Sequence, residues 1–478
     1  MNREKYDVVV IGAGVVGAAI ARDLAGTSKR VALIDSNTDV CGGTSKANTA
    51  ILHTGYDAKP GTLEARLVAR GYHLTREYCA QTGISVERTG AILVAWDEEQ
   101  AESLVGLQQK AVENGYTDSY LMSAAEVYEE LPDIGQGATG GLAVPDESII
   151  DPWTVPLAFA TQAVERGAEL ILECQVHGVE VGGARADGAE TAGAEKHGAE
   201  TILRTSRGDI RAGWVINAAG LGGDHIDAMF GYDRLKITPR RGELLVYDKL
   251  TSHLAPKIVL AAPSKVGKGV LISPTIFGNT MLGPTADDIE DRTDTGTSEV
   301  GFEFLLEKGK KIMPKLLGHE VTAAYAGLRA AHNQPDYLIE TDGAQRYCIA
   351  GAIRSTGLTS ALAVAEYVRE LLEEEGLDLT LREDLPEPPR MPALGEYGVR
   401  PYLDGELIAR DPDFGTVVCF CERVTKGEII AAAGSTIPPA TLEGVRRRTR
   451  AMNGRCQGFF CGAHVKEIFE AHTGKAAR

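Results

Sequence analysis

A glycine-rich turn between two apolar segments is the feature that most constrains the fold of this chain. The apolar run Val8–Ile11 leads into a turn in which Gly12, Gly14 and Gly17 have the spacing G-x-G-x-x-G, and RVALID returns as a second apolar run. In a βαβ unit, such glycines allow a tight turn, close approach of the backbone to a pyrophosphate, and close packing of the helix on the strand. The pattern therefore predicts a strand, a helix and a second strand that bind a dinucleotide at the amino end of the helix.

The residues that follow this turn favour FAD as the nucleotide. Asp35 closes the second strand, where a carboxylate can accept ribose hydroxyls and would repel a 2′-phosphate. The chain has one such glycine pattern, whereas an enzyme that moves hydride from NAD to FAD usually has two. A small-residue loop, CGGTSKANTAILHTG, could lie along a flavin ring, and Gly351 and Gly357 belong to a late strand–loop–helix segment whose helix would direct its amino end at the pyrimidine edge. A glycine turn in an ordinary βαβ unit is the alternative interpretation.

Composition and charge describe a folded chain of more than one domain. The 478 residues are 44% hydrophobic and 24% charged, and the net charge of −18 argues against nucleic acid as a partner. No uncharged apolar run reaches the ~18 residues that a membrane-spanning helix needs. The first residues run straight into a strand, which leaves no room for a secretory signal, and the eight cysteines are expected to be reduced. We therefore expect a cytoplasmic protein, which a partner could hold at the inner face of the membrane.

Four cysteines lie close together near the carboxyl end, in the patterns C-x-C and C-x₄-C. A disulfide framework is disfavoured in a reducing compartment, and C-x-C is shorter than the C-x₂₋₄-C knuckles that zinc sites usually use. Four thiolates with one very short and one longer spacing suit a 2Fe–2S cluster. A structural zinc site and a nucleic-acid patch built on the nearby arginines remain alternatives. The predicted metal ligands are Cys419, Cys421, Cys456 and Cys461.

Several motifs together resemble the D-amino-acid-oxidase superfamily of FAD-dependent oxidoreductases. They are the glycine turn, GTSKANTAILHTG, RGELLVYD, AGLRAAHNQPDYLIE and RSTGLTSALAVAEYV. Within the superfamily, the chain is most similar to anaerobic-type glycerol-3-phosphate dehydrogenases and L-2-hydroxyglutarate oxidases. The cysteine region, with the helical stretches TKGEIIAAAG and TLEGVRRRTRAMNG between its two cysteine pairs, resembles the bacterioferritin-associated-ferredoxin-like 2Fe–2S domain. The resemblance implies FAD and a 2Fe–2S cluster as cofactors.

The resemblance also implies a fold class that combines α/β and α+β parts. A Rossmann-like FAD-binding domain of the glutathione-reductase type, at about 1–80, 150–225 and 325–375, would be interleaved with an antiparallel-sheet substrate domain at about 81–149 and 226–324. A Pro-rich linker (376–414) and a small helical Cys₄ iron–sulfur domain (415–478) would follow. The expected FAD-binding residues are Gly12, Gly14, Gly17, Asp35, Thr44, Ser45, Asn48, Thr49, Val176, Ala219, Gly220, Gly351, Gly357, Leu358 and Thr359.

Oxidation of an alcohol needs a base for the hydroxyl proton, and an anionic substrate needs a cationic clamp. The resemblance places His53 near the flavin as the base, although a packed loop histidine is the alternative. Arg329 matches the family arginine that holds a substrate carboxylate or phosphate. Where glycerol-3-phosphate dehydrogenases typically have G-G-K-L-T, this chain has IRSTGLT, so that Arg354 stands near the position of the absent lysine. Further candidates are Arg241, His332, Lys265 and Lys268.

These expectations describe a dehydrogenase that oxidises the C–OH of a small anion related to glycerol 3-phosphate or L-2-hydroxyglutarate. Electrons would pass from FAD through the cluster to an external acceptor, which is a carrier protein, a partner subunit or a quinone system, and the chain could work as a hetero- or homo-oligomer. The rival hypotheses are an amino-acid or secondary-amine dehydrogenase and a non-catalytic electron-transfer subunit. The acidic repeat Gly188–Glu200 is expected to be a mobile hairpin extension.

Overall fold

The computed structural model describes residues 4–182, 200–263 and 269–476. The predictions for the repeat Gly188–Glu200 and for Lys265 and Lys268 concern segments that lie wholly or almost wholly outside these ranges. The chain divides into two compact units, each assembled from three separate segments. The first contains residues 1–46, 155–239 and 329–389, and the second contains residues 47–154, 240–328 and 390–478. Among the described residues, no helix is both long enough and apolar enough to cross a membrane.

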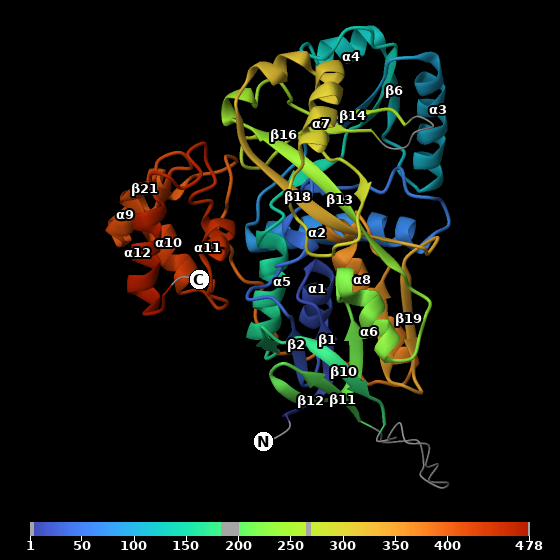
Figure 1. The fold of residues 1–478 in the computed structure, drawn as a ribbon, viewed down its shortest axis with the longest axis vertical. Helices are drawn as coiled ribbons and strands as arrows, with labels where there is room; N and C mark the ends of the chain where they lie inside the picture. Colours follow the sequence, from blue (N-terminus) through green and yellow to red (C-terminus); the bar gives the residue numbers. More distant parts are fainter. Residues whose placement is uncertain (1–3, 183–199, 264–268, 477–478) are drawn as a thin grey trace. The chain divides into compact units, whose positions relative to one another are not determined.

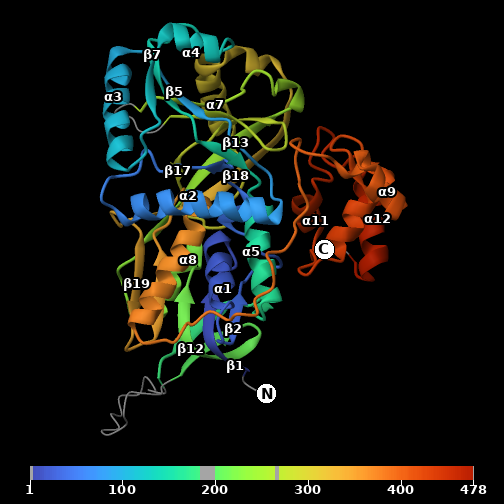
Figure 2. The ribbon, with the colours of Figure 1, turned by 180° about the vertical axis from the view of Figure 1, so that it is seen from behind.

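The first unit is built on a sheet whose central strands are parallel. The strand order is β10-β11-β12-β1-β2-β9, with β20 beside β12 and β19 beside β20. The long strand β12 pairs along one edge with β1, and along the other with β11 at its start and β20 at its end. Helix α1 lies between α5 and α8 in Figures 1 and 2. The bounds are β1 Glu4–Ile11, α1 Val15–Leu24, β2 Val31–Ile34, α5 Thr154–Glu165, β9 Glu169–Ile171, β10 Val176–Glu180, β11 Thr201–Thr205, β12 Gly208–Asn217, α6 Gly223–Met229, β19 Leu338–Asp342, β20 Tyr347–Gly351 and α8 Gly357–Glu374.

The apolar runs read from the sequence form the core of this unit. Val8, Val9 and Val10 in β1 have no exposed surface, and the small residues of α1 are buried against the sheet and α8. Strands buried on both faces read as continuous apolar runs, because helices cover each side of a parallel sheet. The sequence VVVIGAG therefore specifies both the strand and the turn that follows it.

The second unit contains a large, mainly antiparallel sheet. Its strand order is β17-β13-β16-β15-β14-β5-β7-β6, with β18 also paired to β13, and the β14–β5 pair is parallel. A small sheet, β3-β8-β4, brings together the start and end of the segment 47–154. The bounds are β3 Ile51–Leu52, α2 Leu63–Thr82, β4 Val86–Glu87, β5 Ala91–Ala95, α3 Glu98–Glu113, β6 Tyr120–Ser123, α4 Ala124–Glu130, β7 Gly140–Val144, β8 Ser148–Ile150, β13 Ile237–Tyr247, β14 Ile258–Ala261, β15 Leu271–Pro274, β16 Thr280–Gly283, β17 Asp287–Asp288, α7 Glu299–Ile312 and β18 Val321–His332.

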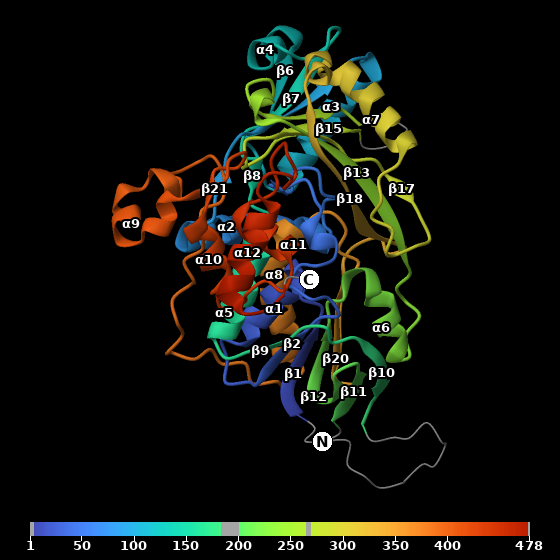
Figure 3. The same cartoon turned by 60° about the vertical axis from the view of Figure 1, so that its left-hand side comes forward.

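The carboxyl-terminal part of this unit has a small core of its own. Helices α10, α11 and α12 gather there (Figure 3), and Val418, Val424, Ile429, Val445 and Val465 are buried among them. The bounds are α9 Gly405–Arg410, β21 Val417–Cys419, β22 Val424–Thr425, α10 Lys426–Ala433, α11 Leu442–Thr449 and α12 Gly462–Thr473.

The Pro-rich segment before this part is irregular but anchored. In the first unit, the Arg382 guanidinium donates to the carbonyl oxygens of Ala25 and Arg166, at 3.2 and 2.8 Å. In the second unit, the Met391 N–H donates to the Thr82 carbonyl, and Leu394 is buried in the core of the large sheet. The segment therefore contacts the first unit through Arg382 and the second unit through Met391 and Leu394.

Candidate functional site

The glycine turn has the geometry that its spacing predicts. Gly12 has φ +104°, and a Cβ there would lie 2.4 Å from the Ala218 carbonyl oxygen. A Cβ on Gly17 would lie 1.9 Å from the Gly12 oxygen. Both positions therefore require glycine, because a side chain would push helix α1 away from the strand. The Ala13 N–H donates to Asp35 Oδ2 at 2.7 Å, so Asp35 also braces the turn from the end of β2.

Most of the other expected FAD-binding residues of the first unit lie around the carboxyl ends of the central strands. Ser45, in the short helix Thr44–Lys46, accepts a hydrogen bond from the Val15 N–H at 3.0 Å. Ala219 and Gly220 follow β12, and the Ala218 N–H donates to the Ile11 carbonyl at 2.9 Å, which holds this loop beside Gly12. Ligands of open α/β sheets bind in the crevice at this edge. Gly351 ends β20, and Gly357, Leu358 and Thr359 form the first turn of α8.

Three expected FAD-binding residues have other surroundings. Val176 is a buried residue of β10 that packs in the core of the first unit. Asn48 and Thr49 belong to the second unit, where Asn48 Oδ1 accepts the Ala50 N–H at 2.7 Å and the Asn48 carbonyl accepts the Tyr325 hydroxyl at 2.8 Å.

His53 has a buried carboxylate as its partner. It follows β3, and Leu52 pairs with Ser148 in β8, so the strand register brings His53 to Glu147. His53 Nδ1 lies 2.9 Å from Glu147 Oε2, and Glu147 Oε1 accepts the Thr54 N–H at 2.6 Å and the Thr54 hydroxyl at 3.0 Å. Glu147 is only 2% exposed. With Nδ1–H donating to this carboxylate, the ring carries its lone pair on Nε2.

The sequence reading missed Glu147. It lies in VPDESIID, where nothing in the sequence distinguishes this buried glutamate from an acidic residue at the surface. Its position beside His53 depends on the pairing of two very short strands that are far apart in the chain, and periodicity does not reveal that register.

The predicted cations fall into two groups. In the first unit, Arg329 lies in β18, and the exposed Arg354 lies close enough to His332 to affect it. Burial lowers the pKa of His332 below its usual value, and the positive charge of Arg354 lowers it further. In the second unit, Arg241 binds Glu243 at 3.3 Å and Asp294 at 3.1 Å, so two carboxylates already balance its charge.

The four late cysteines lie close enough together for their thiols to affect one another. Cys421 contacts Cys456, and Cys461 contacts Cys419. The hydrogen bond from the Phe460 backbone lowers the pKa of the Cys456 thiol most, burial opposes it, and hydrogen bonds with Cys421 and with the backbone of Gly458 and Phe459 lower the pKa further. Among the described residues, no group of three or more His, Cys, Asp or Glu side chains is arranged to hold a single metal ion. Four neighbouring thiols fit a 2Fe–2S cluster, which takes two thiolates on each iron.

The arginines beside these cysteines do not form a solvated basic face. Arg447, Arg448 and Arg450 are 8%, 6% and 7% exposed. The Arg448 guanidinium donates to the carbonyl oxygens of Gly444 and Ile437, and Arg447 pairs with Glu443. Buried arginines bound to backbone and carboxylate groups have a packing function, which removes the main support for a nucleic-acid patch.

Arg450 connects the cysteine-containing part to the large sheet of the second unit. Its guanidinium lies 4.2 Å from the ring centre of Phe277 and donates to Glu422 Oε2 at 3.2 Å and to Asn279 Oδ1 at 3.3 Å. Lys249 Nζ lies 3.0 Å from the same Glu422 oxygen. Glu422 directly follows Cys421, so this ion pair holds one cysteine loop in place.

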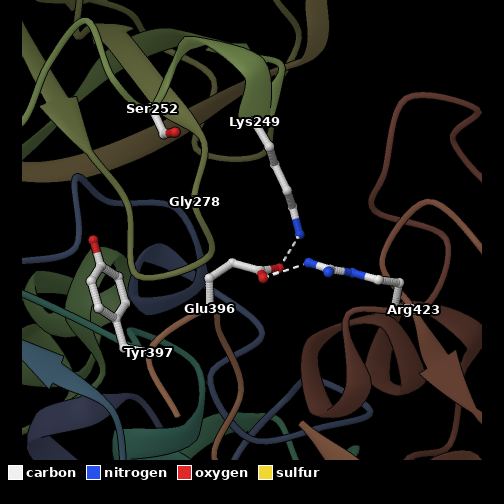
Figure 4. A pocket seen from close by; sticks show the side chains of 6 residues that line it. All are labelled: Lys249, Ser252, Gly278, Glu396, Tyr397 and Arg423. Carbon is white, nitrogen blue, oxygen red and sulfur yellow. Dashed lines mark hydrogen bonds and ion pairs between the residues drawn. The ribbon is translucent and has the colours of Figure 1, made fainter. Parts of the chain in front are cut away.

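A cavity of about 400 Å³ lies next to this connection, with Glu396 between Lys249 and Arg423 (Figure 4). Burial would raise the pKa of Glu396, but Lys249 at 2.8 Å and Arg423 at 2.5 Å lower it overall. None of the described residues predicted for the substrate, FAD or the cluster lines this cavity. Its lining residues are Lys249, Ser252, Gly278, Glu396, Tyr397 and Arg423.

Comparison with known proteins assigns both parts of the chain. Residues 7–371 match the family described as FAD dependent oxidoreductase. The chain belongs to this family. Residues 417–471 match the BFD-like [2Fe-2S] binding domain, so this FAD-dependent oxidoreductase also has a 2Fe–2S domain. The predictions of the family, the fold class and both cofactors are confirmed.

Several relatives of this oxidoreductase have related names. It is 35% identical to a glycerol 3-phosphate dehydrogenase of Caloramator mitchellensis over 98% of this chain and 95% of the relative. It is 26% identical to one of the chains of the anaerobic glycerol-3-phosphate dehydrogenase of Escherichia coli K12, over 98% of this chain and 89% of the relative. The dithionite-reduced, FAD-bound L-alpha-glycerophosphate oxidase of Mycoplasma pneumoniae superposes with a TM-score of 0.73 at 26% identity, covering 81% of this chain and 99% of that one.

Proposed function

We propose that this oxidoreductase is a glycerol-3-phosphate dehydrogenase that passes its electrons to an external acceptor. The observation that carries the proposal is the pair formed by His53 and the buried Glu147, because it supplies an oriented base for an alcohol proton. The 35% identity to a relative named glycerol 3-phosphate dehydrogenase, over nearly the whole of both chains, supports the choice of substrate.

In this proposal, bound FAD supplies the hydride acceptor and the 2Fe–2S cluster supplies a one-electron outlet. His53 takes the hydroxyl proton of the substrate at Nε2, while Glu147 fixes the ring through Nδ1. Arg329 and Arg354 bind the phosphate, for which a guanidinium offers two parallel N–H donors. The glycine turn, Ser45 and the first turn of α8 orient the FAD, and Asp35 accepts its ribose hydroxyls.

We further propose that each part of the chain has the binding function that the sequence predicts for it. The interleaved segments up to about residue 375 bind FAD and substrate, residues 376–414 connect them to the next part, and residues 415–478 hold the cluster on Cys419, Cys421, Cys456 and Cys461. The mutual contacts of these four thiols support their assignment as the ligands.

L-2-Hydroxyglutarate is the second candidate substrate. The human L-2-hydroxyglutarate dehydrogenase is 28% identical over 60% of this chain, and Arg354 stands near the position where glycerol-3-phosphate dehydrogenases have a lysine. A carboxylate would suit the same arginines as a phosphate.

Anaerobic bleaching of the flavin band distinguishes these candidates. Glycerol 3-phosphate is expected to bleach the wild-type protein faster than L-2-hydroxyglutarate, lactate or amino acids, and His53→Ala is expected to slow bleaching by about 100-fold or more. Faster bleaching by L-2-hydroxyglutarate would transfer the assignment to the hydroxy acid. Bleaching by amines that does not need His53 would support assignment as an amine dehydrogenase. If no compound bleaches the flavin, the result would support assignment as a non-catalytic electron-transfer subunit.

A further inference from the structure

Three phenylalanines beside the cluster cysteines are strongly exposed. Phe420, Phe459 and Phe460 are 64%, 97% and 70% exposed. Phe420 lies between Cys419 and Cys421, and the other two directly precede Cys461. Among the described residues, the other exposed phenylalanine is Phe304, at 42%. Exposure of this side chain is thus concentrated at the metal-ligand loops.

Phe420 and Phe460 are in contact, and Phe459 is the chain neighbour of Phe460; we call these three side chains the aromatic patch. The Phe420 and Phe460 rings meet edge to face, with centres 5.4 Å apart, so the patch joins the two cysteine loops. The backbone of Phe459 and Phe460 also hydrogen-bonds the Cys456 sulfur. Cys421 and Cys456 are the more exposed of the four thiols, while Cys419 and Cys461 are buried. The patch therefore lies beside the accessible edge of the ligand set.

The aromatic patch is not explained by folding. The core of this part consists of other residues, such as Val418, Ile429 and Phe469, so the three exposed rings add little to its packing. Contiguous exposed apolar side chains mark interaction sites, and aromatic rings are enriched where partners bind most strongly. A partner protein accounts for their position and their exposure.

The charge beside the patch indicates what kind of partner would fit. The Arg446 guanidinium donates to the amide oxygens of Asn453 at 3.1 Å and Gln457 at 3.2 Å, which places a positive charge beside the loop that carries Phe459 and Phe460. The chain as a whole has a net charge of −18. A local cation on an acidic molecule favours a partner whose binding face carries acidic side chains around an apolar centre.

We propose that the aromatic patch, with Arg446 at its rim, is the docking site of an oxidised one-electron carrier protein that has an acidic, apolar-centred face. In each encounter, one electron passes from the reduced cluster to the oxidised carrier. Because the oxidation of one substrate molecule releases two electrons, two carrier molecules are reduced for each substrate molecule. A small patch of three rings suits the limited interface of a transient redox encounter. The proposal rests on the proposed function for the direction of electron flow.

The test uses two haem proteins of opposite charge as probes, the acidic soluble domain of cytochrome b5 and the basic cytochrome c. The purified holoprotein is reduced with stoichiometric dithionite, and the reduction of each probe is followed by stopped-flow absorbance at low and high salt. The double variant Phe420→Ser/Phe460→Ser is compared with wild type and with Phe304→Ser, an exposed phenylalanine on α7 that serves as the matched control. Iron and acid-labile sulfide are measured in every variant, and Phe459→Ser gives a second test at the most exposed ring.

Wild type and Phe304→Ser are expected to reduce cytochrome b5 faster than cytochrome c, and salt should slow the reaction. The patch variants are expected to lose about tenfold or more of the rate with cytochrome b5 at unchanged cluster content. Arg446→Glu should reverse the preference between the two probes. Titration of ¹⁵N-labelled cytochrome b5 with the oxidised holoprotein provides a readout without turnover, in which the patch variants should weaken the shift changes.

Equal rates in wild type and the patch variants would overturn the proposal, as would faster reduction of cytochrome c by the wild type. Sedimentation that shows a wild-type dimer, and a monomer for the double variant, would assign the patch to a second copy of this chain instead. Because dithionite replaces the substrate, docking is tested separately from the proposed function. If glycerol 3-phosphate fails to bleach the flavin while the probe results hold, only the substrate assignment is wrong.

Discussion

A single buried carboxylate determines which nitrogen of His53 is available for chemistry. Glu147 accepts three hydrogen bonds, two of them from Thr54, so its position is fixed before His53 is considered. Holding Nδ1 in its protonated state leaves Nε2 as the acceptor, which is the state that a general base needs.

Replacing Glu147 with glutamine tests this arrangement. The amide can keep the contact but loses the charge and no longer selects the tautomer, so we expect glycerol 3-phosphate to bleach the flavin about 10- to 100-fold more slowly, with little change in the substrate concentration that gives half the maximal rate. Asp146→Asn, at the neighbouring acid, is the control. A Glu147→Gln variant with the wild-type bleaching rate would exclude Glu147 from the positioning of His53.

The lowered pKa of His332 makes the free energy of unfolding depend on pH, and the direction of the pKa shift sets the sign of that dependence. Its pKa in the folded protein is lowered by burial and by Arg354, so the unfolded chain binds the proton more tightly. The contribution of His332 to stability is complete above the unfolded pKa of about 6.5 and is lost as the pH falls below it. Urea unfolding at about pH 5.5 and 7.5 should show a smaller loss of stability on acidification in His332→Gln than in wild type, and an equal loss would contradict this prediction.

At the scale of elements, local patterns were predictable and long-range registers were not. The β1–α1–β2 unit follows from its glycines, because Gly12 and Gly17 admit no side chain. The pairing of β3 with β8 and the burial of Arg447, Arg448 and Arg450 depend on segments far apart in the chain. A run of arginines reads as a solvated face until the residues that cover it are known.

The contact between Arg450 and Phe277 predicts how the cysteine-containing part is held in the second unit. Arg450→Leu leaves the buried Glu422 with Lys249 alone, and the loss of a buried hydrogen bond to a charged group costs about 1.5–3 kcal/mol. We expect a lower urea midpoint and faster proteolytic cleavage within residues 396–414. The exposed Arg410→Leu is the matched control. Unchanged proteolysis of Arg450→Leu would show that this contact does not hold the part in place.

At the scale of the whole molecule, the parts of the chain that bind the two cofactors differ in how many separate segments form them. The unit that contains the glycine turn is assembled from three separate segments of the chain, whereas the match to the 2Fe–2S domain is the single stretch 417–471. This difference explains why the four cysteines could be predicted as ligands from their spacing, and their role as ligands also stays a prediction. The roles of His53, Arg329 and Arg354 stay predictions, because they depend on how distant segments meet a substrate.

Removal of the cluster should therefore leave the flavin chemistry intact. Cys456→Ser is expected to lose the cluster absorbance and to retain FAD, with bleaching by glycerol 3-phosphate within about twofold of wild type and reduction of cytochrome b5 strongly slowed. Cys348→Ala is the control, because burial raises the pKa of that thiol to about 12 and keeps it unreactive. Loss of FAD from Cys456→Ser would show instead that the two sites fold as one.

The anchored segment and the Arg450 contact also bear on how such an enzyme could be rebuilt or could have evolved. Leu394 fills part of the core of the large sheet, and Arg450 binds Asn279 and Phe277 of the same unit. A ferredoxin-like module grafted in place of residues 415–478 would replace both Arg450 and Glu422, so Phe277, Asn279 and Lys249 would lose these contacts. Exchange of the electron outlet between related enzymes therefore requires that the surface around Phe277 and Asn279 be transplanted together with the module.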